Sequence, residues 1–113
     1  MIEVSRERFE ELVADALDGI PSELGGYMDN VAVFVRDTPP HPNLLGLYEG
    51  VPLTVRGISY SGRMPDRITI YRNPICARAR SEDEVVVEVR RVVIHEVAHH
   101  FGIDDPRLRE LGW

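Results

Sequence analysis

The spacing of apolar residues near the amino terminus predicts an amphipathic helix over residues 5–18. Its apolar positions recur at three- and four-residue intervals, which places them on one face of a helix. They are Phe9, Leu12, Val13, Ala16 and Leu17. Ser5 stands in the position of an N-cap. We expect this face to pack on a core, and a short second helix to begin near Pro21.

Three later segments read as extended chain. Residues 31–35 are a run of β-formers, and residues 44–53 form a second extended segment with bends at its glycines. Residues 65–72 contain the clearest strand, because Ile68 and Ile70 alternate with more polar neighbours as in a half-buried strand. Three prolines make residues 37–43 a loop, and His41 in that loop reads as a solvated histidine. Residues 54–65 are predicted to form a turn or a flexible lip.

Helices are predicted again in the last third of the chain. Asn73 is expected to cap a short helix that ends near residue 80. Ser81 and Glu84 have the spacing of a capping box at the start of a helix over residues 82–101. That helix is rich in valine, so its stability depends on burial more than on helix propensity. A last short helix is expected to begin at residue 104 or 105, with the terminal Trp113 packed against the domain.

Composition limits the classes of function. The 113 residues fit a single domain over residues 1–113, and this length can bury a core without disulfides. The net charge of −6 disfavours nucleic acid as a partner. One cysteine, Cys76, allows no internal disulfide, and neither a signal peptide nor a membrane-spanning run is evident. We therefore expect a cytoplasmic protein without a membrane partner. The sequence does not predict its oligomeric state.

The predicted helix 82–101 ends in the most specific pattern of the chain, His-Glu-Val-Ala-His at residues 95–99. His95 and His99 are four residues apart, so both can face one Zn²⁺ ion. In zinc hydrolases of this pattern the glutamate, here Glu96, takes a proton from water instead of binding the metal. Gly102 can end the helix and let the chain turn back, which would bring Asp105 to the same ion as a third ligand.

The alternative is that the motif is a chance pattern with no metal site. The pattern fixes only three positions, so it arises by chance in roughly one chain of this length in a few hundred. Histidine and glutamate can also be solvated or capping residues of a helix. The apolar residues just before the motif and the offsets of the glycine and aspartate favour a metal site.

The chain resembles the zincins, and most closely the small bacterial zincin-like metallopeptidases. Residues 95–105 carry this resemblance, and residues 65–72 and 45–50 support it more weakly. The resemblance implies an α+β fold, a minimal zincin in which a small twisted mixed sheet packs on a long active-site helix with additional short helices. It implies that His95, His99 and Asp105 bind zinc, with Asp104 as the alternative third ligand, and that Glu96 is the general base. It further implies an edge strand that pairs with an extended peptide, for which residues 66–72 are our candidate.

The chain departs from the pattern of the larger zincins in one respect. No methionine follows Met64, so the chain lacks the methionine turn of the large metzincins. His100 is not a motif position and lies about 100° around the helix from His99, which predicts a supporting or surface role.

The sequence therefore predicts a zinc metallopeptidase that hydrolyses peptide bonds in a peptide or protein substrate. A second donor must stabilise the oxyanion beside the zinc, and Tyr48, Tyr71 and His41 are candidates among which the sequence does not choose. The alternative is a metal-binding protein of zincin fold without catalysis. A metal-dependent nuclease is ranked third, because Glu96 and the acidic balance both argue against it.

Overall fold

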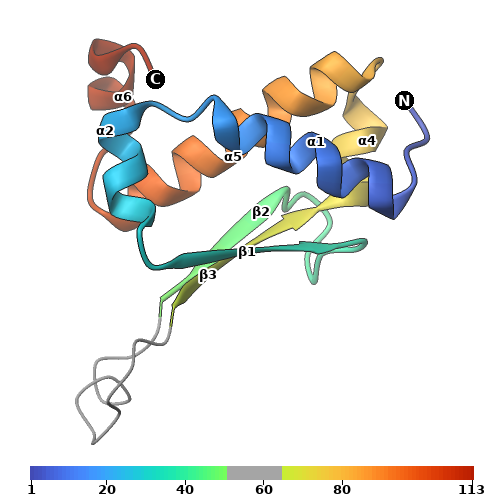
Figure 1. The fold of residues 1–113 in the computed structure, drawn as a ribbon, viewed down its shortest axis with the longest axis horizontal. Coiled ribbons are helices and arrows are strands. Elements are labelled where there is room, and N and C mark those ends of the chain that lie inside the picture. The colour runs from blue at the N-terminus through green and yellow to red at the C-terminus, as the bar shows by residue number, and fades with distance from the viewer. Residues whose placement is uncertain (51–64) are drawn as a thin grey trace, which may run out of the picture.

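The computed structural model describes residues 1–50 and 65–113. The predicted extended residues 51–53 and the predicted turn 54–64 lie outside the described residues. The elements, in chain order, are α1 (Arg6–Asp18), α2 (Ser22–Gly25), η1 (Gly26–Met28), β1 (Val31–Arg36), β2 (Gly46–Glu49), β3 (Asp66–Tyr71), α4 (Arg72–Arg78), α5 (Glu82–His100) and α6 (Asp105–Leu111). Figure 1 shows this order as a small sheet with helices along one face. The predicted α+β class is confirmed.

The described strands form one mixed sheet in the order β1-β3-β2, in which β3 is parallel to β1 and antiparallel to β2. The prediction that residues 66–72 form the edge strand is therefore wrong, since β3 is the central strand. The half-buried pattern predicted for it is also wrong, because the four residues 68–71 are all buried. Thr69 is buried and pairs with Phe34 on β1 and with Leu47 on β2, so a strand lies on each side of it.

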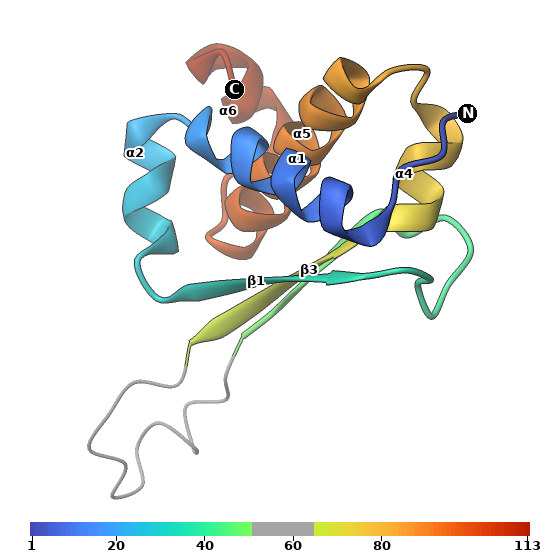
Figure 2. The ribbon, with the colours of Figure 1, turned by 45° about the vertical axis from the view of Figure 1, so that its right-hand side comes forward.

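Helices α1 and α5 pack on each other and on one face of the sheet (Figures 1 and 2). The predicted apolar stripe of α1 is buried apart from Leu17, which is partly buried. The valine-rich α5 has seven buried residues along its 19, so burial supports a helix whose propensity is modest. Buried side chains from the described segments join in one core cluster, against which Trp113 packs as predicted. No helix within residues 1–50 and 65–113 is long and apolar enough to cross a membrane.

Side-chain caps fix the starts of α1 and α5. The hydroxyl of Ser5 accepts from the Arg8 N–H, and that of Ser81 accepts from the Glu84 N–H at 3.2 Å, as predicted. Asn73, however, is not an N-cap. It lies inside the first turn of α4, where its side-chain amide donates to Thr38 Oγ1 and its N–H to the Asp37 carbonyl. Asn73 thus ties the proline-rich loop to α4 instead of starting the helix.

The edge strand β2 runs alongside α5 in a matching register. A Cβ atom on Gly46 would lie 2.6 Å from Val92 Cγ1, Tyr48 bonds to Glu96, and Gly50 faces His100. Two residues of a strand advance about 6.7 Å and four residues of a helix about 6 Å. The contacts therefore recur at matching intervals along both elements, and the tightest of them is between Gly46 and the Val92 side chain.

We expect Gly46→Ala to lower the free energy of unfolding by about 1–3 kcal/mol, the usual cost of overpacking. The new methyl group would collide with Val92, a buried residue with few rotamers, and would lie 3.2 Å from the Thr69 carbonyl oxygen. Urea unfolding measures the change. Gly26→Ala is the matched control, because Gly26 has helical backbone angles and a methyl group on it would meet nothing within 4 Å. Equal losses in both variants would contradict close packing at Gly46.

Candidate metal centre

Two histidines and one aspartate converge where α5 gives way to α6. His95 and His99 are one turn apart on α5, and Asp105 is the first residue of α6. Candidate ligand atoms of the three side chains all lie within 4.8 Å of one another. Their side chains are 34%, 47% and 56% exposed, respectively, so the cluster faces solvent at the surface of the molecule.

A sharp helix ending brings the aspartate back to the histidines. Gly102 has φ of 83°, its N–H donates to the His99 carbonyl, and the Ile103 N–H donates to the Ala98 carbonyl at 2.8 Å. These two bonds form the Schellman motif, for which glycine is the favoured residue because it has no Cβ. The predicted role of Gly102 in ending the helix is confirmed.

The structure separates the two aspartates that the sequence left open. Asp104 caps α6, since its Oδ1 accepts from the Arg107 N–H at 3.0 Å. The Asp105 carboxylate instead faces the histidines, with Oδ1 2.8 Å from His99 Nε2 and 3.7 Å from His95 Nδ1. It is therefore Asp105, and not Asp104, that the fold brings to the histidine pair.

This donor set fits zinc chemically. Neutral imidazole nitrogens and a carboxylate oxygen are zinc ligands at about 2.0–2.2 Å, so two ligand atoms on one ion can be separated by up to about 4 Å. The distances from Asp105 Oδ1 to His99 Nε2 and to His95 Nδ1, 2.8 and 3.7 Å, lie within that limit. The hydrogen bond from His99, followed by the positive charges of His99, His95 and Arg109, lowers the pKa of Asp105. The carboxylate is consequently ionised at neutral pH, as a metal ligand must be.

Glu96 lies beside these donors and faces β2. Its Oε1 accepts a hydrogen bond from the Tyr48 N–H at 3.3 Å. The Leu45 carbonyl accepts from the Tyr71 N–H, so the odd positions of β2 bond to β3 and Tyr48 points its N–H outward. The edge strand thus presents a backbone donor directly to the glutamate of the motif.

Of the three residues considered as a second donor, only Tyr48 lies next to Glu96. Its hydroxyl donates to Asp66 Oδ2 at 2.7 Å, which fixes the ring. Tyr71 is buried at the opposite end of β3, and His41 lies in the loop that runs beside α4 (Figure 1). The structure therefore does not bring Tyr71 and His41 to the centre.

Sequence reasoning did not include His100 among the site residues. Its ring stacks on Tyr48, with centroids 4.0 Å apart and an interplanar angle of 22°. The signal was available, because His100 is four residues after Glu96 and so shares the face of α5 that meets β2. The pairing with Tyr48, 52 positions earlier in the chain, had no local signal.

Comparison with known families agrees with this arrangement. The profile of the family described as zincin-like metallopeptidase matches residues 28–113, from η1 to the carboxyl terminus. The chain belongs to this zincin-like family.

Among solved structures, this zincin-like chain is similar to a conserved hypothetical protein from Thermus thermophilus. The two are 26% identical, the alignment covers 86% of this chain and 94% of the other, and the TM-score is 0.55. None of the curated proteins matches the chain. The resemblance inferred from the sequence is confirmed at the level of family and fold, and the roles of the individual site residues stay predictions.

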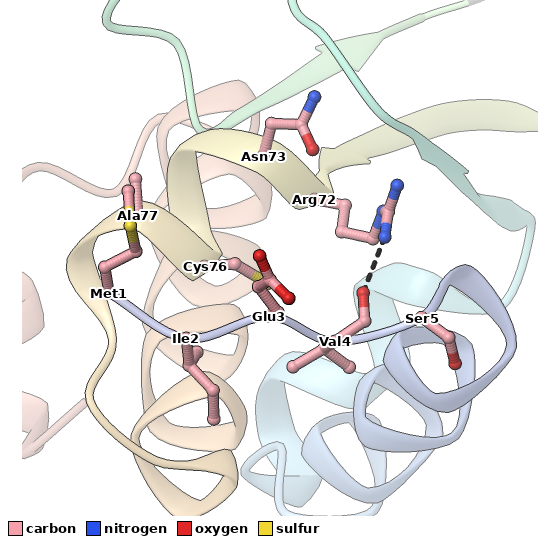
Figure 3. Close-up of a pocket in the computed structure, with 9 residues that line it drawn as sticks. All are labelled: Met1, Ile2, Glu3, Val4, Ser5, Arg72, Asn73, Cys76 and Ala77. Carbon is pink, nitrogen blue, oxygen red and sulfur yellow. Dashed lines mark hydrogen bonds between the residues drawn. The ribbon is translucent and has the colours of Figure 1, made fainter.

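A cavity of about 670 Å³ lies elsewhere in the zincin-like fold, between the amino-terminal segment and α4 (Figure 3). Arg72 crosses it to donate to the Val4 carbonyl, and Cys76 lines its wall. Burial raises the pKa of the Cys76 thiol, which disfavours its nucleophilic thiolate form. This cavity is at the end of the molecule opposite the α5–α6 turn and contains none of the motif residues.

The two aspartates provide a matched pair of variants. We expect Asp105→Ala to weaken Co²⁺ or Zn²⁺ binding by more than about tenfold, since even the partners of metal ligands contribute that much. Asp104→Ala removes a cap and should lower the free energy of unfolding by about 1 kcal/mol while leaving metal affinity nearly unchanged. Cobalt absorption titration and urea unfolding separate the effects. Weaker binding in Asp104→Ala alone would reverse the assignment.

Proposed function

We propose that this protein is a zinc-dependent metallopeptidase in which His95, His99 and Asp105 hold the metal and Glu96 is the general base. The observation that supports this most directly is the convergence of three ligand-type atoms within 4.8 Å, next to a glutamate that faces an edge strand. Membership of the zincin-like metallopeptidase family supports the same class of reaction.

The metal supplies Lewis acidity when bound, making water acidic near neutral pH and polarising a carbonyl group. The protein supplies the proton transfer. Glu96 accepts a proton from the attacking water and returns it to the leaving amine. The hydrogen bond from the Tyr48 N–H holds the Glu96 carboxylate beside β2, next to the metal donors.

The substrate would bind as an additional strand at the outer edge of β2. The alternation of hydrogen bonds leaves the N–H and carbonyl groups of the even positions, Gly46 and Tyr48, directed away from β3. The outward N–H and carbonyl groups of Gly46 would pair with an extended peptide, while the Tyr48 N–H stays bonded to Glu96. In this mode main-chain bonds give affinity and side-chain subsites give specificity. Strand β2 therefore takes the role that the sequence had assigned to residues 66–72.

The substrate is then a peptide or an extended segment of a protein. Nucleic acid is not proposed, since the net charge is −6. We also propose a cytoplasmic location, because the single cysteine, Cys76, allows no internal disulfide, which suits a reducing compartment.

Conservative variants of the motif test the roles. Glu96→Gln should retain about one zinc per chain and lose about 10²–10⁴-fold in kcat, because an amide cannot accept the proton. His99→Ala should lose the zinc itself. His41→Ala is the matched histidine control and should keep both metal and activity. Elemental mass spectrometry and cleavage of a peptide library measure the two properties. Full activity of Glu96→Gln would exclude Glu96 as the base.

A metal-binding protein without catalysis is the alternative function. It is favoured by one observation. The contact between Asp105 and His99 already joins α6 to α5, so a metal bound there would also hold α6 against α5 and stabilise the fold. Removing the metal with a chelator should lower the melting temperature under either function, since a ligand of the native state stabilises it by mass action. Zinc-dependent stabilisation without cleavage of any library peptide would favour this alternative.

A further inference from the structure

Four ring side chains from separate parts of the chain meet beside the candidate centre. Tyr27 comes from η1, Tyr48 from β2, and His100 and Phe101 from the end of α5. Phe101 stands edge-on to His100 at 4.9 Å and to Tyr48 at 6.1 Å, and its other neighbour is Tyr27 at 4.9 Å. We call these four residues the aromatic ledge.

Part of the ledge is open to solvent. Tyr27 is 46% exposed and Phe101 is 41% exposed, and they are in contact with each other. Single exposed apolar side chains are ordinary, as Phe34 on β1 illustrates, but adjacent ones on a rigid support are typical of a binding surface. Within the ledge, Tyr48 is held at its hydroxyl by Asp66 and on its ring face by His100.

The ledge is continuous with the catalytic groups. His100 follows His99 directly, and the Tyr48 N–H donates to Glu96. From Glu96 to His100 the helix rises about 6 Å, which two residues of an extended peptide span. A peptide paired with β2 and placed at Glu96 would therefore present a side chain to the ledge within about two residues of the bond to be cut.

We infer that the aromatic ledge is a subsite for a large apolar or aromatic side chain of the substrate, close to the scissile bond. The inference rests on the proposed peptidase function for the origin of that side chain. The ledge offers ring faces and edges, which suit another ring packed edge-to-face or offset. None of the four ledge side chains is a carboxylate, and the nearby Asp66 carboxylate accepts the hydrogen bond from the Tyr48 hydroxyl.

The test measures binding apart from cleavage. The background is zinc-loaded Glu96→Gln, whose amide oxygen can still accept from the Tyr48 N–H. The probes are blocked, fluorescently labelled octapeptides of alanine and serine in which one phenylalanine is moved along the chain. At one position we expect phenylalanine to bind roughly tenfold more tightly than alanine, because burying its side chain is worth that much or more.

Variants of the ledge identify the surface responsible. Adding Phe101→Ala to the Glu96→Gln background should reduce the preference for phenylalanine to less than about threefold. Phe34→Ala is the matched control: Phe34 is 44% exposed but lies on β1, beyond the central strand, and its loss should leave the preference intact. Phe101→Leu and Tyr27→Ala cover the case in which Phe101→Ala does not fold. A preference that survives in all folded ledge variants, or no preference at any position, overturns the proposal.

Cleavage of the same peptides by the zinc-loaded protein with Glu96 intact separates this proposal from the function on which it rests. Cleavage without a preference for phenylalanine would overturn the proposal that the ledge is a subsite and would support the proposed peptidase function. If binding shows a preference for phenylalanine that requires Phe101, but no peptide is cleaved, the ledge remains a proposed binding site and the proposed peptidase function is overturned.

Discussion

The close approach of β2 to α5 is the constraint on which the candidate site depends. At Gly46 no side chain separates the strand from Val92, and a methyl group there would lie 2.6 Å from Val92 Cγ1. This contact sets the register further along, where Tyr48 meets Glu96 and then His100. A larger residue at position 46 would move the strand outward, and the glutamate would lose its backbone donor. One glycine thus links core packing to the geometry of the candidate site.

Helix α5 serves the core and the site at once, on different faces. Its valines pack under α1 and on the sheet, while His95 and His99 stay partly exposed on the adjoining face. Because the helix is held by seven buried side chains, its last turn can present histidines and a glutamate in fixed positions without support from intrinsic propensity. The Schellman turn at Gly102 then returns the chain toward the helix it has just left.

What the sequence predicted correctly was mostly local. The helix periodicities, the Ser5 and Ser81 caps, the end of α5 at Gly102 and the spacing of His95 and His99 all follow from residues within a few positions of each other. Strand order is not local, and this is why β3 was taken for an edge although two strands flank it. The N-cap role predicted for Asn73 was wrong for a related reason, since its side-chain amide bonds to Thr38 in a loop that is distant in sequence. The ledge joins Tyr27 to Phe101 across 74 positions, which no short-range pattern could indicate.

The exposure of the metal donors constrains how such a small protein can recognise a substrate. Between a third and somewhat over half of each donor side chain faces solvent, so the centre itself encloses little of a ligand. Affinity must then come from its borders. One border is formed by the outward backbone groups of β2, which bind the main chain of a peptide and do not distinguish its side chains. The neighbouring border is the aromatic ledge, which can distinguish them. An extended peptide with a large apolar residue near the reactive bond satisfies both borders, whereas a compact polar ligand would satisfy neither.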